Sequence, residues 1–349
     1  MRPLAVLLAF LAAPLAAQSA ADSLDLFVVA GQSNAVGAGG TLALAPVPPA
    51  GSAYWAHVQR DGSVRLHEMD GTLFLSRSAW PAFAVRYHER TGRRVLLLQT
   101  AVGATSNAAA ADRGNGHWSA LHPGPGAEGG PDRLAEAVAL LADVLRQLPS
   151  DARLRPAGVL WAQGETDASK IDERRITAED YRTEMEATVA RLRSAVGAPF
   201  GRGPVPFYLV QTGSRAGGDT DGHAAVREVQ RAGAAAGLYT LACDHAQEFP
   251  ALGMLVDDVH WDQGALNHVG EHMADVAAGD APPAPPPVAA ARPYPNPARP
   301  GQAVRGLPPG TRLFDVLGRH VATADLGGVL VAPAAAGVYV ADGARVIVQ

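Results

Sequence analysis

Cysteine and lysine are almost absent from this sequence of 349 residues. Cys243 is the only cysteine, so the chain cannot form an internal disulfide bond, and we expect a small, inert, buried thiol. Lys170 is the only lysine, and the chain contains no run of basic residues. Together with a net charge of −5, this distribution argues against a nucleic-acid partner.

The sequence also lacks an apolar run at its N-terminus that is long enough to cross a membrane. The run at residues 4–15 is interrupted by Pro14, whereas a transmembrane helix needs about 20 apolar residues. Arg2 precedes this run and small residues follow it, which is typical of a signal peptide. We therefore expect residues 1–21 to be removed, and the protein to be exported through the periplasm to the cell surface or the medium.

Short apolar runs alternate with helical patterns between residues 22 and 278, which we interpret as one domain. The predicted strands are 26–30, 95–99, 157–161, 207–210 and 238–242, and the predicted helices are 80–90, 131–145, 177–192, 224–236 and 266–278. This alternation predicts an α/β fold with a parallel five-stranded sheet and helices on both faces. Right-handed crossovers would make it a three-layer α/β/α sandwich.

A polar loop rich in glycine follows the second predicted strand, over residues 107–130. Residues 124–129 formally match a dinucleotide fingerprint, but they do not follow a strand, and Pro125 fits the phosphate turn poorly. We expect no cofactor there or elsewhere in the chain.

The composition of the chain changes after residue 278. Residues 279–292 are rich in proline and alanine and predict a stiff linker. Residues 293–349 contain short β-like segments separated by glycine and proline, which predicts a small all-β module.

Chemically capable residues follow several of the predicted strands. Ser33 follows the first strand, Gly103 the second and Gln163 the third, and the carboxyl ends of parallel strands meet at one edge of a sheet. A lone serine after a strand is most often a turn or cap residue. The alternative is a nucleophile, which needs a base and an oxyanion hole from elsewhere in the chain.

The loop after the fifth predicted strand supplies a candidate base. His260 can take a proton from Ser33, and Asp257, three residues earlier, can fold back to hold the imidazole tautomer. An isolated Asp-x-x-His is usually a surface loop, but its occurrence together with the other strand-end residues favours catalysis. Ala35 stands where a G-x-S-x-G elbow has its last glycine, which argues against an α/β-hydrolase.

Four motifs carry a resemblance to a known superfamily: Gly31-Gln32-Ser33-Asn34, Ala101-Val102-Gly103, Trp161-Ala162-Gln163-Gly164-Glu165-Thr166-Asp167 and Asp257-Asp258-Val259-His260. With these the chain resembles the SGNH hydrolases, which have a flavodoxin-like fold. Within them it resembles the sialate O-acetylesterase and acetylxylan esterase group, carbohydrate esterase family 6. The resemblance implies a metal-independent serine esterase that removes O-acetyl groups from an oligo- or polysaccharide of the acetylxylan or sialate type.

The same resemblance implies roles for individual residues. Ser33 would be the nucleophile that forms an acyl-enzyme, His260 the base and Asp257 its partner. The oxyanion hole would use the backbone N–H groups of Ser33 and Gly103. The side-chain amide of Gln163 would replace the superfamily's Gly-x-Asn-Asp asparagine, because that tetrapeptide is absent.

Several residues in or near these motifs leave more than one role open. Ala104 stands where this family often has a second glycine, so the turn after Gly103 can differ. Glu165 is expected to brace its loop rather than to act in catalysis. Trp118, together with His117, either offers a stacking face to a sugar or anchors the loop.

Two functions from other classes remain as alternatives. One is a zinc peptidase that binds its metal through His268 and His272, because residues 268–272 match H-x-x-E-H. Against it, Gly270 interrupts the predicted helix, and little chain follows that could supply a third ligand. A non-catalytic carbohydrate-binding protein is the other, but it leaves the coincidence of serine, aspartate and histidine unexplained.

The C-terminal residues resemble a different family, the sorting domain of the bacterial type IX secretion system. The matching segments are Tyr294-Pro295-Asn296-Pro297, Leu313-Phe314-Asp315-Val316-Leu317-Gly318-Arg319 and Ala336-Gly337-Val338-Tyr339. The resemblance implies the type IX secretion machinery as a partner. The alternative is a β-sandwich that binds sugar or tethers the enzyme.

Overall fold

The computed structural model describes residues 23–58, 64–72, 76–148 and 153–280, together with six short strands between residues 303 and 348. Residues 22–284 form one compact unit, and residues 285–349 belong to another. The predicted signal peptide, residues 281–292 of the linker and the Tyr294–Pro297 motif lie outside the described residues. In the described part of the chain, no helix is long and apolar enough to span a membrane.

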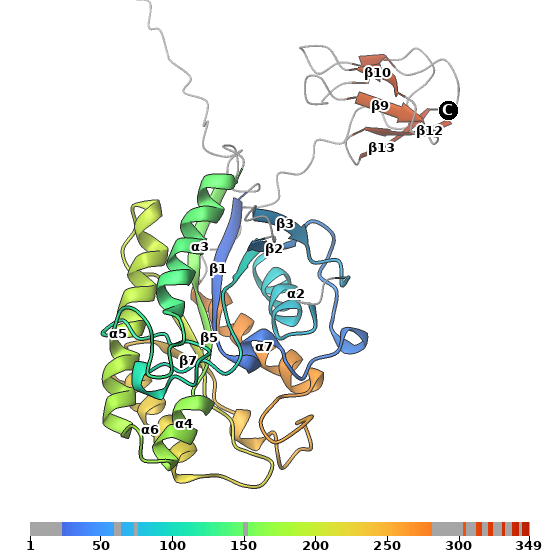
Figure 1. The fold of residues 1–349 in the computed structure, drawn as a ribbon. Coiled ribbons are helices and arrows are strands. Elements are labelled where there is room, and N and C mark those ends of the chain that lie inside the picture. The colour runs from blue at the N-terminus through green and yellow to red at the C-terminus, as the bar shows by residue number, and fades with distance from the viewer. Residues whose placement is uncertain are drawn as a thin grey trace, which may run out of the picture. The chain divides into compact units, whose positions relative to one another are not determined.

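The larger unit is built on a seven-stranded sheet of order β3-β2-β4-β1-β5-β6-β7 (Figure 1). Its strands are β1 (Ser23–Gly31), β2 (Ala53–Val58), β3 (Val64–Glu68), β4 (Arg94–Gln99), β5 (Arg153–Ala162), β6 (Phe207–Val210) and β7 (Thr240–Cys243). Neighbouring strands are parallel except β2 and β3, which pair antiparallel. The α/β class is confirmed, and the five predicted strands lie in the flavodoxin-like order β4-β1-β5-β6-β7.

The prediction of a five-stranded, entirely parallel sheet is wrong, because β2 and β3 extend it as an antiparallel hairpin. β3 has the sequence VRLHE and lies at the edge of the sheet, where Leu66 is exposed. An edge strand needs no continuous apolar run, so the pattern that identifies the central strands is missing here.

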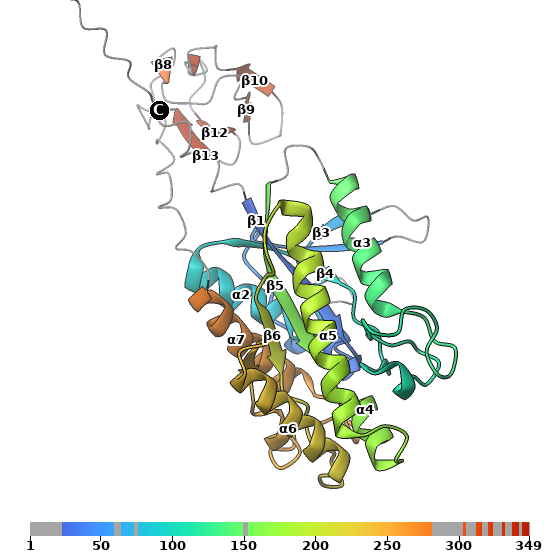
Figure 2. The same ribbon diagram turned by 90° about the vertical axis from the view of Figure 1, so that its left-hand side faces the viewer.

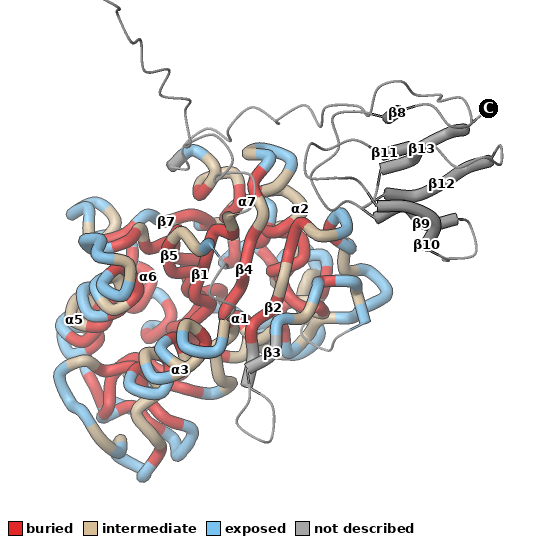
Figure 3. The backbone as a smooth tube through the Cα atoms, turned by 90° about the horizontal axis from the view of Figure 1, so that it is seen from above, coloured by how far each residue is buried: buried red, intermediate tan, exposed pale blue. Residues whose placement is uncertain are grey.

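Helices cover both faces of the sheet (Figure 2). They are α1 (Ser33–Val36), α2 (Trp80–Thr91), α3 (Arg133–Gln147), α4 (Glu165–Asp172), α5 (Ala178–Gly197), α6 (Asp221–Ala235) and α7 (Gln263–Asp280). α2 and α7 pack on one face, and α3 and α5 on the other. The strands are buried between these layers, while the outer faces of the helices are exposed (Figure 3).

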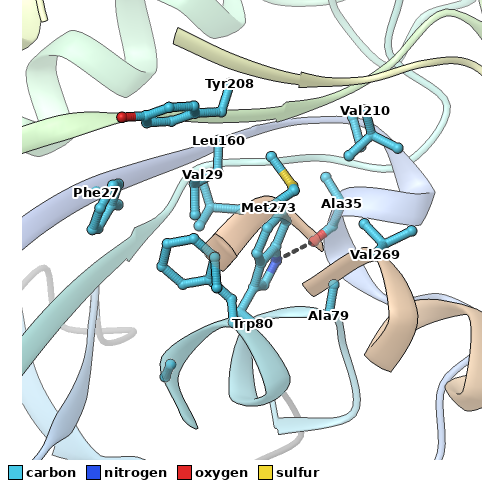
Figure 4. Packing of buried hydrophobic residues seen from close by; sticks show 14 of the residues in the cluster. Phe27, Val29, Ala35, Ala79, Trp80, Leu160, Tyr208, Val210, Val269 and Met273 are labelled. Atoms are coloured by element: carbon cyan, nitrogen blue, oxygen red, sulfur yellow. Dashed lines mark hydrogen bonds between the residues drawn. The ribbon is translucent and has the colours of Figure 1, made fainter. Parts of the chain in front are cut away.

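Alternating residues of the central strands feed the two halves of the core. In β1, Phe27 and Val29 join the cluster under α2 and α7, whereas Leu26 and Val28 join the cluster under α3 and α5. The first cluster also fixes α1, because the Trp80 indole N–H donates to the Ala35 carbonyl at 2.7 Å (Figure 4).

The glycine-rich loop folds around a side chain of the protein itself. The Asp112 carboxylate accepts hydrogen bonds from the backbone N–H groups of Gly114, Gly116, Glu128 and Gly130, at 3.0, 2.8, 3.3 and 2.8 Å. A Cβ atom at Gly130 would lie 2.4 Å from Asp112 Oδ1. Close approach of backbone to this carboxylate therefore explains glycine at that position.

The second unit contains only antiparallel pairings among its described strands. β9 (Arg312–Asp315), β10 (His320–Thr323), β12 (Gly337–Ala341) and β13 (Ala344–Val348) form a sheet of order β10-β9-β12-β13, and β8 (Ala303–Val304) pairs with β11 (Leu330–Val331).

Candidate active site

A cavity of about 460 Å³ lies at the carboxyl edge of the sheet. Its walls come from loops and helices that follow β1, β4, β5, β6 and β7. The lining residues are Gln32, Ser33, Gly103, Ala104, Arg113, Glu165, Thr166, Ser169, Arg215, His223, Asp258, Val259 and His260. The structure thus brings Ser33, Gly103 and His260 to one site.

Ser33 stands at the tip of β1, where the backbone geometry depends on glycine. Gly31 has a φ of +123°, and a Cβ atom there would lie 2.1 Å from the carbonyl oxygen of Ala162. The next residue, Gln32, donates its N–H to the same carbonyl at 2.9 Å. β1 therefore stays pressed against β5 to its last residue, and Ser33 begins α1, half-buried at the cavity wall.

Asp257 and His260 form a tight pair within one loop. Nδ1 of His260 lies 2.6 Å from Oδ2 of Asp257, whose Oδ1 accepts from the backbone N–H groups of Val259 and His260 at 2.9 and 2.8 Å. Desolvation raises the pKa of Asp257, but the hydrogen bonds from the imidazole and the two amides together lower it to about 2. The carboxylate is therefore ionised at neutral pH and favours a proton on Nδ1, which leaves Nε2 as the basic nitrogen.

The neighbouring aspartate has a different partner. Asp258 forms an ion pair with Arg215, from the loop after β6, and both residues line the cavity. The two adjacent carboxylates therefore have different partners, the His260 imidazole and the Arg215 guanidinium.

Gly103 lies directly against Ser33. A Cβ atom added to Gly103 would be 3.8 Å from the Ser33 Cβ, so the two backbones are close neighbours. The following residue, Ala104, has a φ of +58°, in the left-handed region that favours glycine. Ala104 therefore holds a backbone conformation that glycine adopts more readily.

The structure does not bring Gln163 to the cavity wall. Its side chain is buried, and its amide nitrogen donates to the Asp167 carboxylate and lies 3.5 Å from Oε1 of Gln32. Burial raises the pKa of Asp167 to about 6, although its hydrogen bonds with Gln163 and with the N–H groups of Asn107 and Ala108 lower it. Gln163 thus belongs to the packing that anchors the loop after β4 on α4.

Gln32 lines the cavity instead. Its Oε1 accepts from the N–H of Thr166 at 3.3 Å, which fixes the side chain beside Ser33. The sequence interpretation did not single out this residue, although it immediately precedes the candidate nucleophile.

Glu165 and His223 are buried polar groups of the same cavity. Burial raises the pKa of Glu165, whose Oε1 accepts a hydrogen bond from Asn34 at 2.7 Å. Burial also lowers the pKa of His223, whose Nδ1 lies 2.7 Å from the Thr220 hydroxyl. Among the described residues, Nε2 of His223 has no hydrogen-bond partner. Sequence reasoning missed His223, Arg113 and Arg215 because no motif marks them.

Trp118 anchors its loop and offers no face to a sugar. It is fully buried, its ring meets Trp161 edge to face at 5.4 Å between centroids, and its indole N–H donates to Thr105 at 3.1 Å. The neighbouring His117 is also buried, with Nε2 2.8 Å from the carbonyl oxygen of Gly124.

The histidines of the zinc alternative lie on α7, away from this cavity. The rings of His268 and His272 are 4.3 Å apart, and His245 lies 5.1 Å from His272. In the part of the chain that the structure describes, no group of three or more histidine, cysteine, aspartate or glutamate side chains is placed to hold a metal ion. The described residues therefore lend the zinc-peptidase alternative no support.

A second cavity, of about 700 Å³, lies at the amino ends of β1, β5 and β6. Next to it, the buried Asp25 carboxylate binds Arg93 at 2.6 Å and Arg155 at 2.5 Å. Burial raises the pKa of Asp25, but the two guanidinium groups lower it further than burial raises it. The wall of this larger cavity includes no paired nucleophile and base. The smaller cavity, which Ser33 and His260 line, is therefore the candidate active site.

Comparison with known proteins adds a family. The family model for "carbohydrate esterase, sialic acid-specific acetylesterase" matches residues 23–278. No curated protein matches the chain. Similar solved structures include a protein from Arabidopsis thaliana, with 18% identity, 74% of this chain and 99% of that chain covered, and a TM-score of 0.45.

Two further structures are similar at a comparable level. A carbohydrate acetylesterase from Xanthomonas citri has 18% identity, covers 90% of this chain and 74% of its own, and has a TM-score of 0.49. An alpha/beta hydrolase enzyme from the metagenome of Lake Arreo, Spain, has 14% identity, with 74% of this chain and 96% of that chain covered, and a TM-score of 0.39.

Proposed function

Because the chain belongs to the carbohydrate esterase family of sialic acid-specific acetylesterases, we propose that it is a serine esterase that removes O-acetyl groups from a carbohydrate. The observation that carries this proposal is the Asp257–His260 pair, whose histidine lines one cavity together with Ser33. A non-catalytic carbohydrate-binding protein would have no use for an imidazole held by an ionised carboxylate beside a strand-tip serine.

The reaction follows from these groups. Nε2 of His260 takes the proton of the Ser33 hydroxyl as Oγ attacks the acetyl carbonyl carbon. The tetrahedral intermediate then expels the sugar oxygen, which leaves as an alcohol with the proton from His260, and Ser33 is acetylated. Water attacks the acetyl group by the same proton transfers, releasing acetate and free Ser33. Asp257 stays ionised throughout and stabilises the imidazolium.

The backbone N–H groups of Ser33 and Gly103 supply the oxyanion hole in this proposal, because the two residues are in contact at the cavity wall. The Gln32 amide is better placed than that of Gln163 to add a side-chain donor, since Gln163 is bound to Asp167. Gln32→Ala should then lower kcat more than Gln163→Ala. The reverse order would return the role to Gln163.

The substrate that we propose is an acetylated acidic sugar of the sialate type rather than acetylxylan. Arg113 and Arg215 both line the cavity, and Asp258 neutralises Arg215. Arg113 therefore offers its charge to a sugar carboxylate. A neutral xylan chain could accept hydrogen bonds from this arginine but offers no charge to pair with it.

Acetate release from a panel tests the proposal: O-acetylated sialic acid, acetylated xylan and a small aryl acetate. Wild type should release acetate from the sialic acid most efficiently, and Ser33→Ala should lose about 10³-fold or more in kcat. Full activity in a folded Ser33→Ala variant would overturn the serine mechanism. Sugar binding without any acetate release would favour the binding-protein alternative.

We also propose that residues 1–21 direct export and that residues 293–349 are a type IX sorting module joined by a linker. The supporting features are the sequence patterns at both ends of the chain. N-terminal sequencing of the mature protein from its host would test the signal peptide, because an intact N-terminus would contradict it.

A further inference from the structure

Asn34, the residue after the candidate nucleophile, is bonded on both sides of His260. Its Nδ2 donates to the carbonyl oxygen of Val259 at 3.2 Å, and its Oδ1 accepts from the N–H of Trp261 at 3.2 Å. Val259 and Trp261 flank His260 in the chain. One buried side-chain amide therefore holds the backbone immediately before and after the candidate base.

Glu165 completes this arrangement from the other side. Its Oε1 accepts the second Nδ2 hydrogen of Asn34 at 2.7 Å. An asparagine amide has two N–H donors and one oxygen, so these three contacts occupy both hydrogens and the oxygen of Asn34. A flipped amide would place its oxygen against a carboxylate and a carbonyl, and the observed orientation is therefore fixed.

The position of Asn34 in the sequence gives these bonds a consequence for catalysis. Ser33 and Asn34 are consecutive residues of α1, which the Trp80 indole fixes through the carbonyl of Ala35 at 2.7 Å. The loop that carries His260 is more exposed, with Asp257 and Val256 open to solvent. The short helix with the nucleophile thus also carries the group that locates the base.

We propose that Asn34 is a positioning residue that sets His260 relative to Ser33, and that Glu165 acts by orienting Asn34 rather than as an acid or base. This inference rests on the proposed serine mechanism. Asn34 itself does not line the cavity, so it acts on the reaction only through His260.

The first test replaces Asn34 and separates turnover from binding. A displacement of about 1 Å in a reacting group can cost about 10²-fold in rate. Asn34→Ala should therefore lower kcat by about 10²-fold while KM for an aryl acetate stays within about threefold. Asn34→Asp, of nearly the same size, should also lose activity, because it removes both donors and places a carboxylate beside Glu165.

The second test compares two replacements of Glu165. Glu165→Gln keeps an oxygen that can accept from Asn34 and should retain at least about a third of the wild-type kcat, with the same dependence of kcat/KM on pH. Glu165→Ala removes the acceptor and should fall toward the level of Asn34→Ala. If Glu165→Gln is as inactive as Glu165→Ala, Glu165 acts through its proton or charge, and the inference is wrong.

Matched controls separate this role from stability and from the proposed mechanism. Asn267, on α7, has another asparagine amide, which donates to the Leu44 carbonyl at 2.9 Å. Asn267→Ala removes this amide and should keep kcat even where the melting temperature falls. If Asn34→Ala keeps kcat while Ser33→Ala and His260→Ala are inactive, the inference about Asn34 is wrong and the proposed serine mechanism stands. Activity in Ser33→Ala would instead overturn the mechanism on which it rests. If Asn34→Ala does not fold, Asn34→Asp and the Glu165 pair decide the question.

Discussion

Two adjacent aspartates illustrate how single residues divide the work of the site. Asp257 binds the imidazole of His260 at 2.6 Å, whereas Asp258 pairs with Arg215. Asp257 stands three residues before His260, so its carboxylate can curl back to Nδ1. Asp258 stands only two residues before His260 and is less well placed for this contact. The sequence suggested this choice, and the loop geometry supplies its reason.

Asp257→Asn should keep the fold but favour the wrong imidazole tautomer, because an amide can donate to Nδ1. We expect kcat to fall by about 10²- to 10⁴-fold. Asp258→Asn should cost much less and act mainly on KM for an acidic sugar, since Arg215 loses its partner. Steady-state kinetics of both variants on an aryl acetate and on O-acetylated sialic acid check this assignment. A crippled Asp258→Asn beside a mild Asp257→Asn would reverse it.

Asp167 predicts a pH dependence of stability with a definite sign. Burial raises its folded-state pKa to about 6 from a model-peptide value of 3.8. Between about pH 4 and 6 the folded chain keeps a proton that the unfolded chain loses, so the free energy of unfolding falls as pH rises, by about 3 kcal/mol at most. Asp167→Asn should lack this decrease.

The measurement is denaturant unfolding of wild type and Asp167→Asn at several pH values. The difference in unfolding free energy between the two proteins should change between about pH 4 and 6 and become constant above that range. A difference that stays constant across the whole range would mean that Asp167 titrates normally despite its burial.

At the scale of elements, the central strands were predictable because their two buried faces demand continuous apolar runs. Residues 95–99 lie wholly within β4 (Arg94–Gln99), and residues 207–210 coincide with β6 (Phe207–Val210). β2 and β3 were not predictable in the same way, since an edge hairpin mixes polar and apolar residues.

Loops that follow the strands were located from sequence, but the direction of their side chains was not. The chain order places Gln163 at the correct edge of the sheet, yet whether its amide faces the cavity depends on Asp167, Thr105 and Gln32. These contacts join segments that are far apart in sequence. Arg113 was missed for the same reason, because only the folded loop brings it to the cavity.

The loop around Asp112 is the element that presents Arg113 to the cavity. The Asp112 carboxylate accepts hydrogen bonds from four backbone N–H groups. Burial raises the pKa of Asp112, but these hydrogen bonds lower it further than burial raises it. Asp112→Ala should release the loop and raise KM for O-acetylated sialic acid by about tenfold, which corresponds to about 1.4 kcal/mol of lost binding. kcat on an aryl acetate should change little. An equal loss on both substrates would mean that the loop supports Ser33 itself.

At the scale of the whole molecule, the proposed catalytic residues and the cavity belong to residues 22–284, whereas residues 285–349 belong to a separate unit. The family match covers residues 23–278 and ends before that second unit begins. Every side chain assigned a part in the proposed reaction lies within that match. The second unit should therefore contribute nothing to turnover.

A protein of residues 22–284 should remain soluble and hydrolyse a small aryl acetate with a kcat within about twofold of the full-length chain, because few contacts cross a domain linker. Its thermal unfolding should remain one cooperative transition. In a host with the type IX machinery, a chain of residues 1–284, which keeps the proposed signal peptide, should leave the esterase in the periplasm, and fractionation followed by an acetate-release assay can detect it. Loss of activity or solubility in the shortened protein would show that residues 285–349 support the catalytic unit. Unchanged delivery to the surface would remove the basis for a sorting role.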